Sequence, residues 1–325
     1  MRLIVLGTGA GGGCPQWNCG CQNCSFARNN PQSARTTDSL AVAYDDAGRT
    51  VWAIINPGVD LRHQLARHSE LQPRNDGPVR DTPIKAVILT DAELDHTIGL
   101  INLREGSSLK VFATESVLDL MDTKFPIRSV LKNYANLEFC RIKPGIPFFL
   151  GDSVKVESVA LSNRQPRYAN ESVHSPAQGA DSVIGLRFQS VESADDGIAY
   201  APQVGIWDDS ILKLIEGCET ILIDGTFYTS DELLSIGVDA PCAEDMGHLP
   251  LSGPEGILAK LENVKVRIKL LTHINNSNPI LRDNSSERRA VENAGVKIAH
   301  DGMSVCSGVQ LAPLAANEVR DKLCD

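Results

Sequence analysis

Residues 86–100 read AVILTDAELDHTIGL and pass from an apolar run through a dense polar turn into a helical pattern. Residues 84–89, which are apolar except for Lys85, predict a buried strand because the aliphatic residues 86–89 follow one another without alternation. Four potential metal ligands come directly after it: Asp91, Glu93, Asp95 and His96. Side chains at the end of a strand can converge on one cation. An acidic helix start would account for Asp95 but not for His96, so we predict a metal site here.

Short β-branched runs predict further strands at residues 3–6, 40–44, 51–55, 154–161, 221–223 and 266–271. Helical spacing of apolar residues predicts helices at 60–68, 97–104, 114–124, 254–261 and 286–294. Three irregular stretches, 72–83, 162–181 and 228–250, predict long loops, which are often functional. The mixture indicates a layered α/β or α+β architecture.

Residues 19–24 read CGCQNC and bring three cysteines close together: Cys19, Cys21 and Cys24. The chain has nine cysteines, an odd number, and this spacing is typical of zinc binding rather than of disulfides. A tetrahedral zinc needs a fourth ligand from elsewhere. The strongest candidates are His273, Asn275 and Asn276, and Cys14 is a weaker local one. We therefore expect an N-terminal zinc knuckle at residues 14–24.

The glycine run GTGAGGG at residues 7–13 follows the first predicted strand, as in a dinucleotide-binding turn. That interpretation requires a helix directly after the glycines, whereas here they lead into Cys14 and Pro15. A tight turn that leads to a metal-binding loop is the simpler explanation.

Composition narrows the function classes further. The chain has 325 residues, with 31 basic and 41 acidic residues and a net charge of −10. This excess of acid repels phosphate backbones, so nucleic acid is an unfavourable partner. The N-terminal apolar run is too short for a signal peptide, and no stretch has the length of a membrane span. We expect a cytoplasmic protein, in which any transport role would be that of a carrier.

The segment at 91–96 resembles the His-x-His-x-Asp-His motif of metallo-β-lactamase-fold proteins, with Asp91 and Glu93 in place of the two histidines. The resemblance implies a single α+β domain over residues 1–325, built as a four-layer αββα sandwich. Two carboxylates in place of imidazoles make a harder site, which suits iron, manganese or magnesium better than zinc.

Three further segments resemble landmarks of the same fold in the expected order. The segment ILIDGTF at 221–227 resembles the strand that ends in the metal-bridging aspartate, here Asp224. MGHL at 246–249 resembles the segment that supplies a catalytic histidine, here His248, in the transfer-RNA-processing and phosphodiesterase branch. LLTH at 270–273 resembles the last strand, whose terminal histidine completes the metal site.

His273 therefore has two competing roles. In the phosphodiesterase branch, which shares the three-cysteine knuckle, a later histidine binds the structural zinc, and Asn276 stands in that place here. Either Asn276 is a weak fourth ligand or His273 binds the zinc, and we favour His273. The third metal histidine of the fold is replaced by Ser162 and Asn163, and His174 lies further along that loop.

The segments 5–21, 90–96 and 273–281 together are similar to the family of B proteins of pyrroloquinoline quinone (PQQ) synthesis. The resemblance covers nearly the whole chain. It implies a place in PQQ biosynthesis, a structural zinc, and an active-site metal associated with hydroxylation of the tyrosine-derived part of the precursor. The family has also been described as a carrier of PQQ or its precursor to the periplasm.

Our preferred hypothesis is a metal-dependent oxygenase in which the second metal is iron(II). Its catalytic centre would be drawn from Asp91, Glu93, Asp95, His96, Asp224 and His248. The alternative is a non-catalytic carrier in which Arg164 and Arg167 bind the acidic PQQ or its peptide-derived precursor. Other PQQ pathway proteins are further expected partners. A metal-dependent hydrolase, which rests on fold analogy, is the least favoured.

Overall fold

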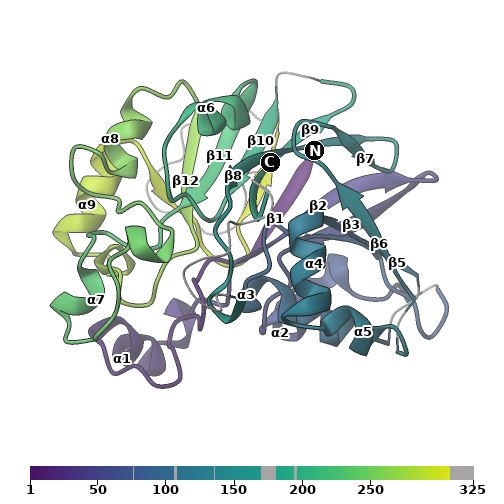
Figure 1. Ribbon diagram of the computed structural model, residues 1–325, viewed down its shortest axis with the longest axis horizontal. Helices are drawn as coiled ribbons and strands as arrows, with labels where there is room; N and C mark the ends of the chain where they lie inside the picture. Colours follow the sequence, from purple (N-terminus) through teal and green to yellow (C-terminus); the bar gives the residue numbers. More distant parts are fainter. Residues whose placement is uncertain (76, 106–107, 135, 170–180, 194–195, 308–325) are drawn as a thin grey trace.

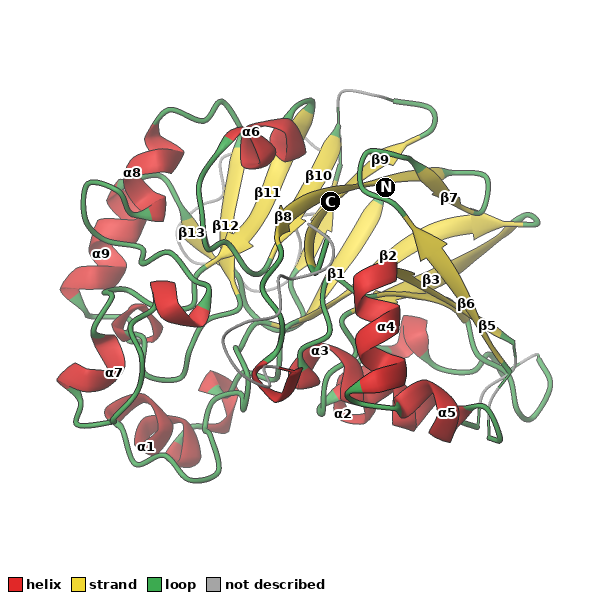
Figure 2. Ribbon diagram, in the orientation of Figure 1, coloured by secondary structure: helices red, strands yellow, loops and turns green. Residues whose placement is uncertain are grey.

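Two seven-stranded sheets lie face to face with helices on both outer sides (Figures 1 and 2). The computed structural model describes residues 1–75, 77–105, 108–134, 136–169, 181–193 and 196–307. The four layers confirm the expected αββα sandwich and its α+β class.

The first sheet has the order β14-β1-β2-β3-β4-β5-β6. Its strands are β1 (Arg2–Gly7), β2 (Ser39–Asp46), β3 (Arg49–Ile55), β4 (Ile84–Ile88), β5 (Leu109–Thr114), β6 (Leu137–Ile142) and β14 (Ser304–Cys306). The pairings from β14 to β3 are antiparallel, and those from β3 to β6 are parallel.

The second sheet has the order β13-β12-β11-β10-β9-β8-β7. Its strands are β7 (Phe148–Leu150), β8 (Val154–Ser162), β9 (Val183–Ser190), β10 (Gly197–Ala201), β11 (Cys218–Asp224), β12 (Ile268–Thr272) and β13 (Lys297–Ile298). Pairings from β7 to β10 are antiparallel and those from β10 to β13 are parallel. Both sheets thus follow one plan, three antiparallel pairings and then three parallel ones.

The α-helices are short. They are α1 (Gln22–Asn29), α2 (Leu61–Arg67), α3 (Leu94–Thr97), α4 (Glu115–Thr123), α5 (Ile127–Leu131), α6 (Asp209–Ile215), α7 (Glu232–Ser235), α8 (Ile257–Glu262) and α9 (Ser286–Asn293). Short 3-10 helices lie at η1 (Pro31–Ser33), η2 (Ser69–Leu71), η3 (Ile98–Leu103), η4 (Arg167–Ala169), η5 (Glu244–Met246) and η6 (Pro279–Leu281). No helix within the described ranges is long and apolar enough to cross a membrane.

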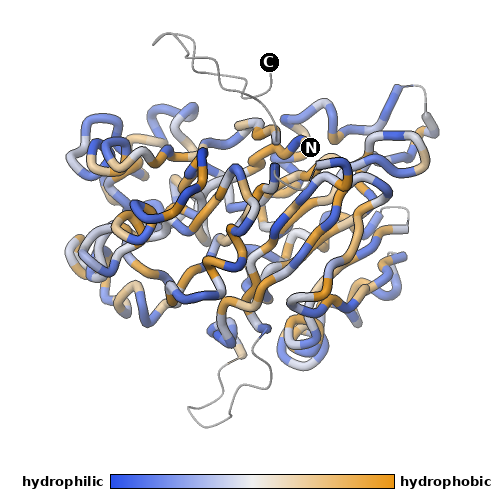
Figure 3. Tube along the Cα trace, turned by 90° about the horizontal axis from the view of Figure 1, so that it is seen from above, coloured by the Kyte–Doolittle hydropathy of each residue, from blue (hydrophilic) through white to orange (hydrophobic). Residues whose placement is uncertain are grey.

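Three apolar clusters hold the layers together. The central cluster joins the inner faces of the sheets and includes Leu3, Phe188 and Tyr200, all fully buried. A second cluster packs α2, α4 and α5 against the first sheet, and a third packs α6, α8 and α9 against the second. Figure 3 shows the apolar residues concentrated along the strands. Removal of this apolar surface from water is the main stabilising contribution.

Each predicted strand corresponds to a strand in the structure. The helix predicted at 97–104 is instead the 3-10 helix η3, which follows the single α-helical turn of α3. Gly99 lets this segment pack closely against the chain at Gly58, because a Cβ there would lie 2.3 Å from the carbonyl oxygen of Gly58. The loop predicted at 228–250 contains α7 and η5.

The sheets bring the candidate site residues to one edge. Strands β4, β11 and β12 run in parallel sections of their sheets and end at Ile88, Asp224 and Thr272. Polar side chains that follow such strand ends meet at the same edge of the sandwich, as in other sheets of this kind.

Candidate metal centres

Asp95, His96 and His273 form a group of three ligands at this edge, and their ligand atoms all lie within 4.8 Å of one another. Oδ2 of Asp95 lies 3.8 Å from Nε2 of His96 and 3.6 Å from Nε2 of His273. Two ligands about 2.1 Å from one ion are at most about 4.2 Å apart. Both distances are below that limit, so one ion fits between the three side chains.

The imidazole of His96 is turned toward this group by Asp91. Nδ1 of His96 lies 2.8 Å from both carboxylate oxygens of Asp91, and both residues are buried. Nε2 of His96 is buried and has no hydrogen-bond partner in the described part of the chain. A buried nitrogen without a partner is costly, and a metal ion would satisfy it. The residues present therefore fit a metal ion.

This geometry corrects the expected role of Asp91. We expected it to bind the metal in place of a histidine, but its oxygens hold Nδ1 of His96, the hydroxyl of Thr90 and the backbone N–H of Glu93. Carboxylates that orient metal-binding histidines in this way are common behind metal sites. Asp91 supports the centre without joining it.

Asp224, His248 and His273 form a second group, which shares His273 with the first. Oδ2 of Asp224 lies 2.7 Å from Nδ1 of His248, and Thr226 contacts Nδ1 of both His248 and His273, at 3.1 and 2.9 Å. The Asp224 carboxylate also accepts hydrogen bonds from Val204 and Thr226. Because its oxygens have these partners, the geometry favours Asp224 as the residue that orients His248, rather than the expected metal bridge.

Charge at the centre favours a cation. Burial lowers the pKa of His96, but the carboxylates of Asp91 and Asp95 outweigh it and raise this pKa to about 10. Burial raises the pKa of Asp95, but His96 and His273 outweigh it and hold it well below its usual range. A metal ion must displace the proton on Nε2 of His96, so metal affinity should increase with pH.

Glu93 lies outside both groups of ligand atoms. Burial and the neighbouring carboxylates of Asp91 and Asp95 raise its pKa to about 7, while Arg164 opposes this rise. Its expected role as a metal ligand is therefore not supported by its position, and it lies beside the centre instead.

Arg164 also lies near the centre, at Gly247. A Cβ at Gly247 would lie 2.5 Å from Cδ of Arg164, and the φ of Gly247 is +90°. The positive φ favours glycine, and the absent Cβ leaves room for the arginine beside the residue before His248. Arg167, the second predicted anion-binding residue, is exposed in η4.

The glycine run packs against the centre. A Cβ at Gly11 would lie 3.3 Å from Oδ2 of Asp95. The backbone of Thr8 and Ala10 exchanges hydrogen bonds of 2.8 and 3.0 Å with Ile274, the residue after His273. The helix next in the chain is α1, which begins only at Gln22. The run is therefore a tight turn, and it packs against the segment that carries His273.

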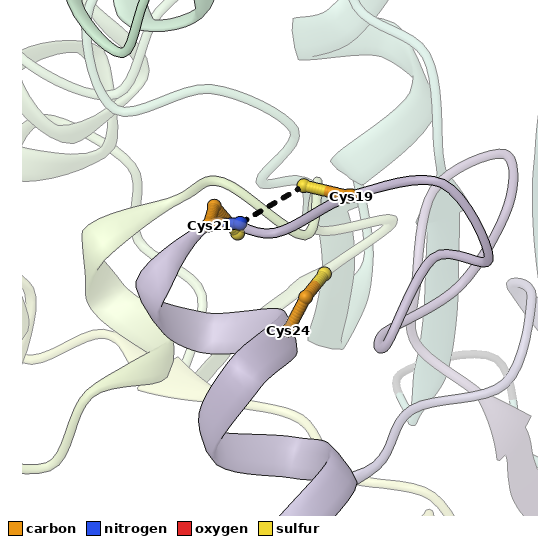
Figure 4. Close-up of side chains that lie close together, drawn as sticks. All are labelled: Cys19, Cys21 and Cys24. Atoms are coloured by element: carbon orange, nitrogen blue, oxygen red, sulfur yellow. Dashed lines mark hydrogen bonds between the residues drawn. The ribbon is translucent and has the colours of Figure 1, made fainter.

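The three cysteines converge as predicted (Figure 4). Cys21 is the N-cap of α1 and Cys24 lies in its first turn, while Cys19 precedes the helix. Backbone N–H groups of Gln16 and Cys21 donate to the sulfurs of Cys24 and Cys19 at 3.3 and 3.4 Å. The N–H of Gln16 opposes the effect of burial, which raises the pKa of Cys24 to about 12, so zinc would have to displace the proton of this thiol.

Asn276, not His273, meets these thiols. Its Nδ2 lies 3.1, 3.7 and 3.3 Å from the sulfurs of Cys19, Cys21 and Cys24. His273 belongs instead to the histidine and carboxylate groups, so our preference for it as the fourth zinc ligand is contradicted by its position. The two ends of an amide are assigned from their contacts, and a rotated Asn276 would present its oxygen to a metal held by the thiols.

Several supporting residues were not predicted from the sequence. Asp38 accepts hydrogen bonds from Tyr200 and from Thr272, the residue before His273. Thr226 lies in the segment 221–227 that the sequence had already singled out, so it could have been predicted as a partner of Asp224. Asp38 stands in no recognisable motif. His174, the possible substitute histidine, lies outside the described residues.

Comparison with known proteins agrees with this arrangement. Residues 51–274 match the family model described as the beta-lactamase superfamily domain. The stacked sheets and the ligands at their strand ends thus define a metallo-β-lactamase-fold protein.

The chain belongs to the coenzyme PQQ synthesis protein B family. It is 39% identical over 310 residues to coenzyme PQQ synthesis protein B of Cupriavidus taiwanensis, covering 93% of this chain and 98% of that protein. It is 35% identical over 308 residues to the protein of that name from Acinetobacter baumannii, covering 94% and 99%.

Solved structures agree with this membership. The crystal structure of Zn²⁺-bound PqqB from Methylobacterium extorquens superposes with a TM-score of 0.84 and 28% identity, covering 94% of this chain and 100% of that one. A diphosphatase from the PhnP family superposes with a TM-score of 0.64 and 22% identity, covering 94% and 97%, which indicates a shared fold.

Proposed function

We propose that this protein acts in PQQ biosynthesis as an iron-dependent oxygenase that hydroxylates the tyrosine-derived part of the precursor. The observation that carries the proposal is the set formed by Asp95, His96 and His273. Two histidines and one carboxylate with open positions are typical of non-haem iron(II) oxygenases. The names of the relatives supply the pathway.

The residues of the chain have distinct roles in this proposal. Asp95, His96 and His273 would hold iron(II), which supplies the activation of dioxygen when bound. Asp91 contacts Nδ1 of His96, and Thr226 contacts Nδ1 of His273. These contacts hold both imidazole rings in orientation without a metal ion. Arg164, beside Glu93 and Gly247, would bind a carboxylate of the acidic substrate.

The three thiols would hold a separate structural zinc. The contacts of Asn276 with Cys19, Cys21 and Cys24 support this part of the proposal. Thiolates select zinc, whereas a centre of two histidines and one carboxylate is a harder site that suits iron(II). Zinc would therefore bind at the thiols and iron at the histidine centre, because the two sites differ in ligand type.

Oxygen consumption tests the activity directly. Protein that carries zinc at the thiols and is then loaded with iron(II) without air would be mixed with oxygen, a reductant and a peptide that carries the tyrosine-derived precursor. We expect substrate-dependent oxygen uptake and a product heavier by one oxygen atom. Zinc in place of iron is the control, and an unchanged peptide mass with iron-loaded protein would contradict the proposal.

A non-catalytic carrier of PQQ or its precursor to the periplasm is the second candidate, favoured by the position of Arg164 at the site. The variant Arg164→Ala with Arg167→Ala should then abolish binding of PQQ and leave the folded state intact. Tight PQQ binding without any turnover by the iron-loaded protein would favour the carrier.

A further inference from the structure

A cavity of about 840 Å³ lies between α1, η1 and the segment that joins η6 to α9. These elements lie together on one side of the molecule (Figure 1). Four arginines line the cavity: Arg35, Arg282, Arg288 and Arg289. Its volume is typical of small-molecule sites, which span about 300–1,000 Å³. The cavity contains none of the ligands of the two metal centres.

The charge of this cavity differs from that of the chain. Four arginines face it with two acidic residues, Asp283 and Glu287, although the whole chain carries −10. A local excess of positive charge on an acidic protein attracts anions and repels cations. The ligand that fits is therefore an anion.

Two of the arginines have N–H donors engaged within the protein already. Arg288 pairs with Glu292 at 3.0 Å and with Asp283 at 3.3 Å. Arg35 donates to the hydroxyl of Thr8 and to the carbonyl oxygen of Ala299. These two side chains shape the wall of the cavity more than they offer donors to a ligand.

Arg282 and Arg289 keep donor capacity. Arg282 donates Nη1 to Oε1 of Gln22 at 2.6 Å, and its Nε is buried with no hydrogen-bond partner in the part of the chain that is described. Arg289 donates Nη1 to the carbonyl oxygen of Asn284 and is exposed. Guanidinium groups bind carboxylates through paired N–H donors, so both can receive an acidic group.

The remaining walls add two features. Helix α9 begins at Ser286, and Ser285 caps it by accepting the N–H of Arg288, so the positive end of the helix faces the same cavity. Phe26, which is 57% exposed, and Leu281 supply an apolar surface. An apolar ring can lie against these two side chains while its acidic groups reach the arginines.

We propose that this cavity binds a small organic polycarboxylate with an apolar ring, with its carboxylates on Arg282 and Arg289. Gln22, which holds Arg282, directly follows Cys21, so the site depends on an intact zinc knuckle. PQQ is a tricarboxylate of this class, so only the identity of the natural ligand, not the site, rests on the proposed function.

Equilibrium titration of the full zinc-loaded chain tests the proposal. The probes are benzene-1,3,5-tricarboxylate, benzoate and inorganic phosphate. We expect saturable binding of the tricarboxylate that is tighter than that of benzoate or phosphate and weakens as salt is added. Arg282→Gln and Arg289→Gln should each weaken it about tenfold, because each loses a charged hydrogen-bond donor.

Arg62→Gln, at an exposed position on α2 that does not line the cavity, removes the same charge and should leave binding unchanged. Arg289 is exposed, so its variant tests the site even where Arg282→Gln fails to fold. Absence of binding to the wild type in the millimolar range would overturn the proposal. So would equal weakening by Arg62→Gln, or phosphate that binds as tightly as the tricarboxylate. None of these outcomes bears on oxygen uptake at the histidine centre.

Discussion

Asp91 holds His96 through both of its carboxylate oxygens, each 2.8 Å from Nδ1. Because the carboxylate accepts a hydrogen bond from Nδ1–H, the lone pair of a neutral ring lies on Nε2, which points toward Asp95 and His273. Asp91, which stands where the motif of the fold has a histidine, thus orients His96. The centre keeps its ligand geometry with fewer histidines than the fold usually has.

Asp91→Asn should weaken metal binding at the histidine centre about 10- to 100-fold, the usual effect of losing such a supporting carboxylate. The amide can still accept a hydrogen bond from His96 but no longer carries a charge that favours a donor on Nδ1. Competition with a chelator for iron(II) measures the affinity.

The zinc content of the thiol site serves as the internal control for this variant, because Asp91 does not contact the cysteines. Asp122→Asn, a surface position paired with Arg128, provides a matched substitution. Unchanged iron affinity in Asp91→Asn would show that Asp91 does not orient His96.

A second prediction concerns the two metal sites. Elemental analysis of the wild type should find zinc and a second metal, and Cys21→Ala should lose the zinc and retain the second metal. A structural zinc contributes folding free energy, so this variant should also have a lower melting temperature. Loss of both metals together, without unfolding, would contradict the separation of the sites.

Asn276→Asp tests the fourth ligand by itself. A carboxylate is a stronger zinc ligand than an amide oxygen, so zinc should bind more tightly if residue 276 faces the metal. His273→Ala should leave zinc at the thiols and weaken the second metal, because His273 lies in the other centre. Loss of zinc from the thiols in His273→Ala, with the second metal retained, would show that His273 is the fourth zinc ligand.

The sequence predicted most of the fold because buried strands leave runs such as those of β4 and β11, which need no knowledge of distant contacts. It also predicted the cysteine site, whose ligands are adjacent in the chain. It did not predict the partition of roles between Asp91, Glu93 and Asp95, because the path of the turn between β4 and α3 decides which of these side chains faces His273. The assignment of His273 depended on how the segment after β12 packs against the glycine run, a contact between residues far apart in sequence.

Asp38 illustrates what the sequence cannot reveal. Its carboxylate joins the two sheets by accepting from Tyr200 of β10 and Thr272 of β12. Nδ2 of Asn56 donates to Thr90 at 2.8 Å and to Tyr200 at 3.3 Å, which extends the network toward Asp91. These residues become neighbours only in the folded sandwich, where they lie behind His96 and His273.

Tyr200→Phe should lower the free energy of unfolding by about 1–3 kcal/mol, because it leaves the buried Asp38 with one donor fewer. Urea unfolding of the metal-loaded protein measures the change. Tyr134→Phe, at a position that is 66% exposed, should change stability by less than about 0.5 kcal/mol. Equal effects of the two substitutions would show that the hydroxyl of Tyr200 does not stabilise the network.

Glu232 makes stability depend on pH through the loop that carries Asn276. Its carboxylate accepts from the backbone of Tyr228 at 2.6 Å and from the hydroxyl of Ser277 at 2.5 Å, and it is only 4% exposed. Burial raises the pKa of Glu232 to about 7 from its usual 4.5. The folded state thus binds this proton more tightly than the unfolded state does.

The stability that this proton provides is complete below about pH 4.5 and is lost as pH rises through about 7. Glu232→Gln stays neutral, and its amide can accept from Tyr228 while donating to Ser277. The free energy of unfolding of the variant, relative to the wild type, should therefore increase by about 2–3 kcal/mol between pH 5 and pH 8. Urea unfolding across this range measures the difference, and parallel pH profiles would mean that Glu232 does not titrate in this window.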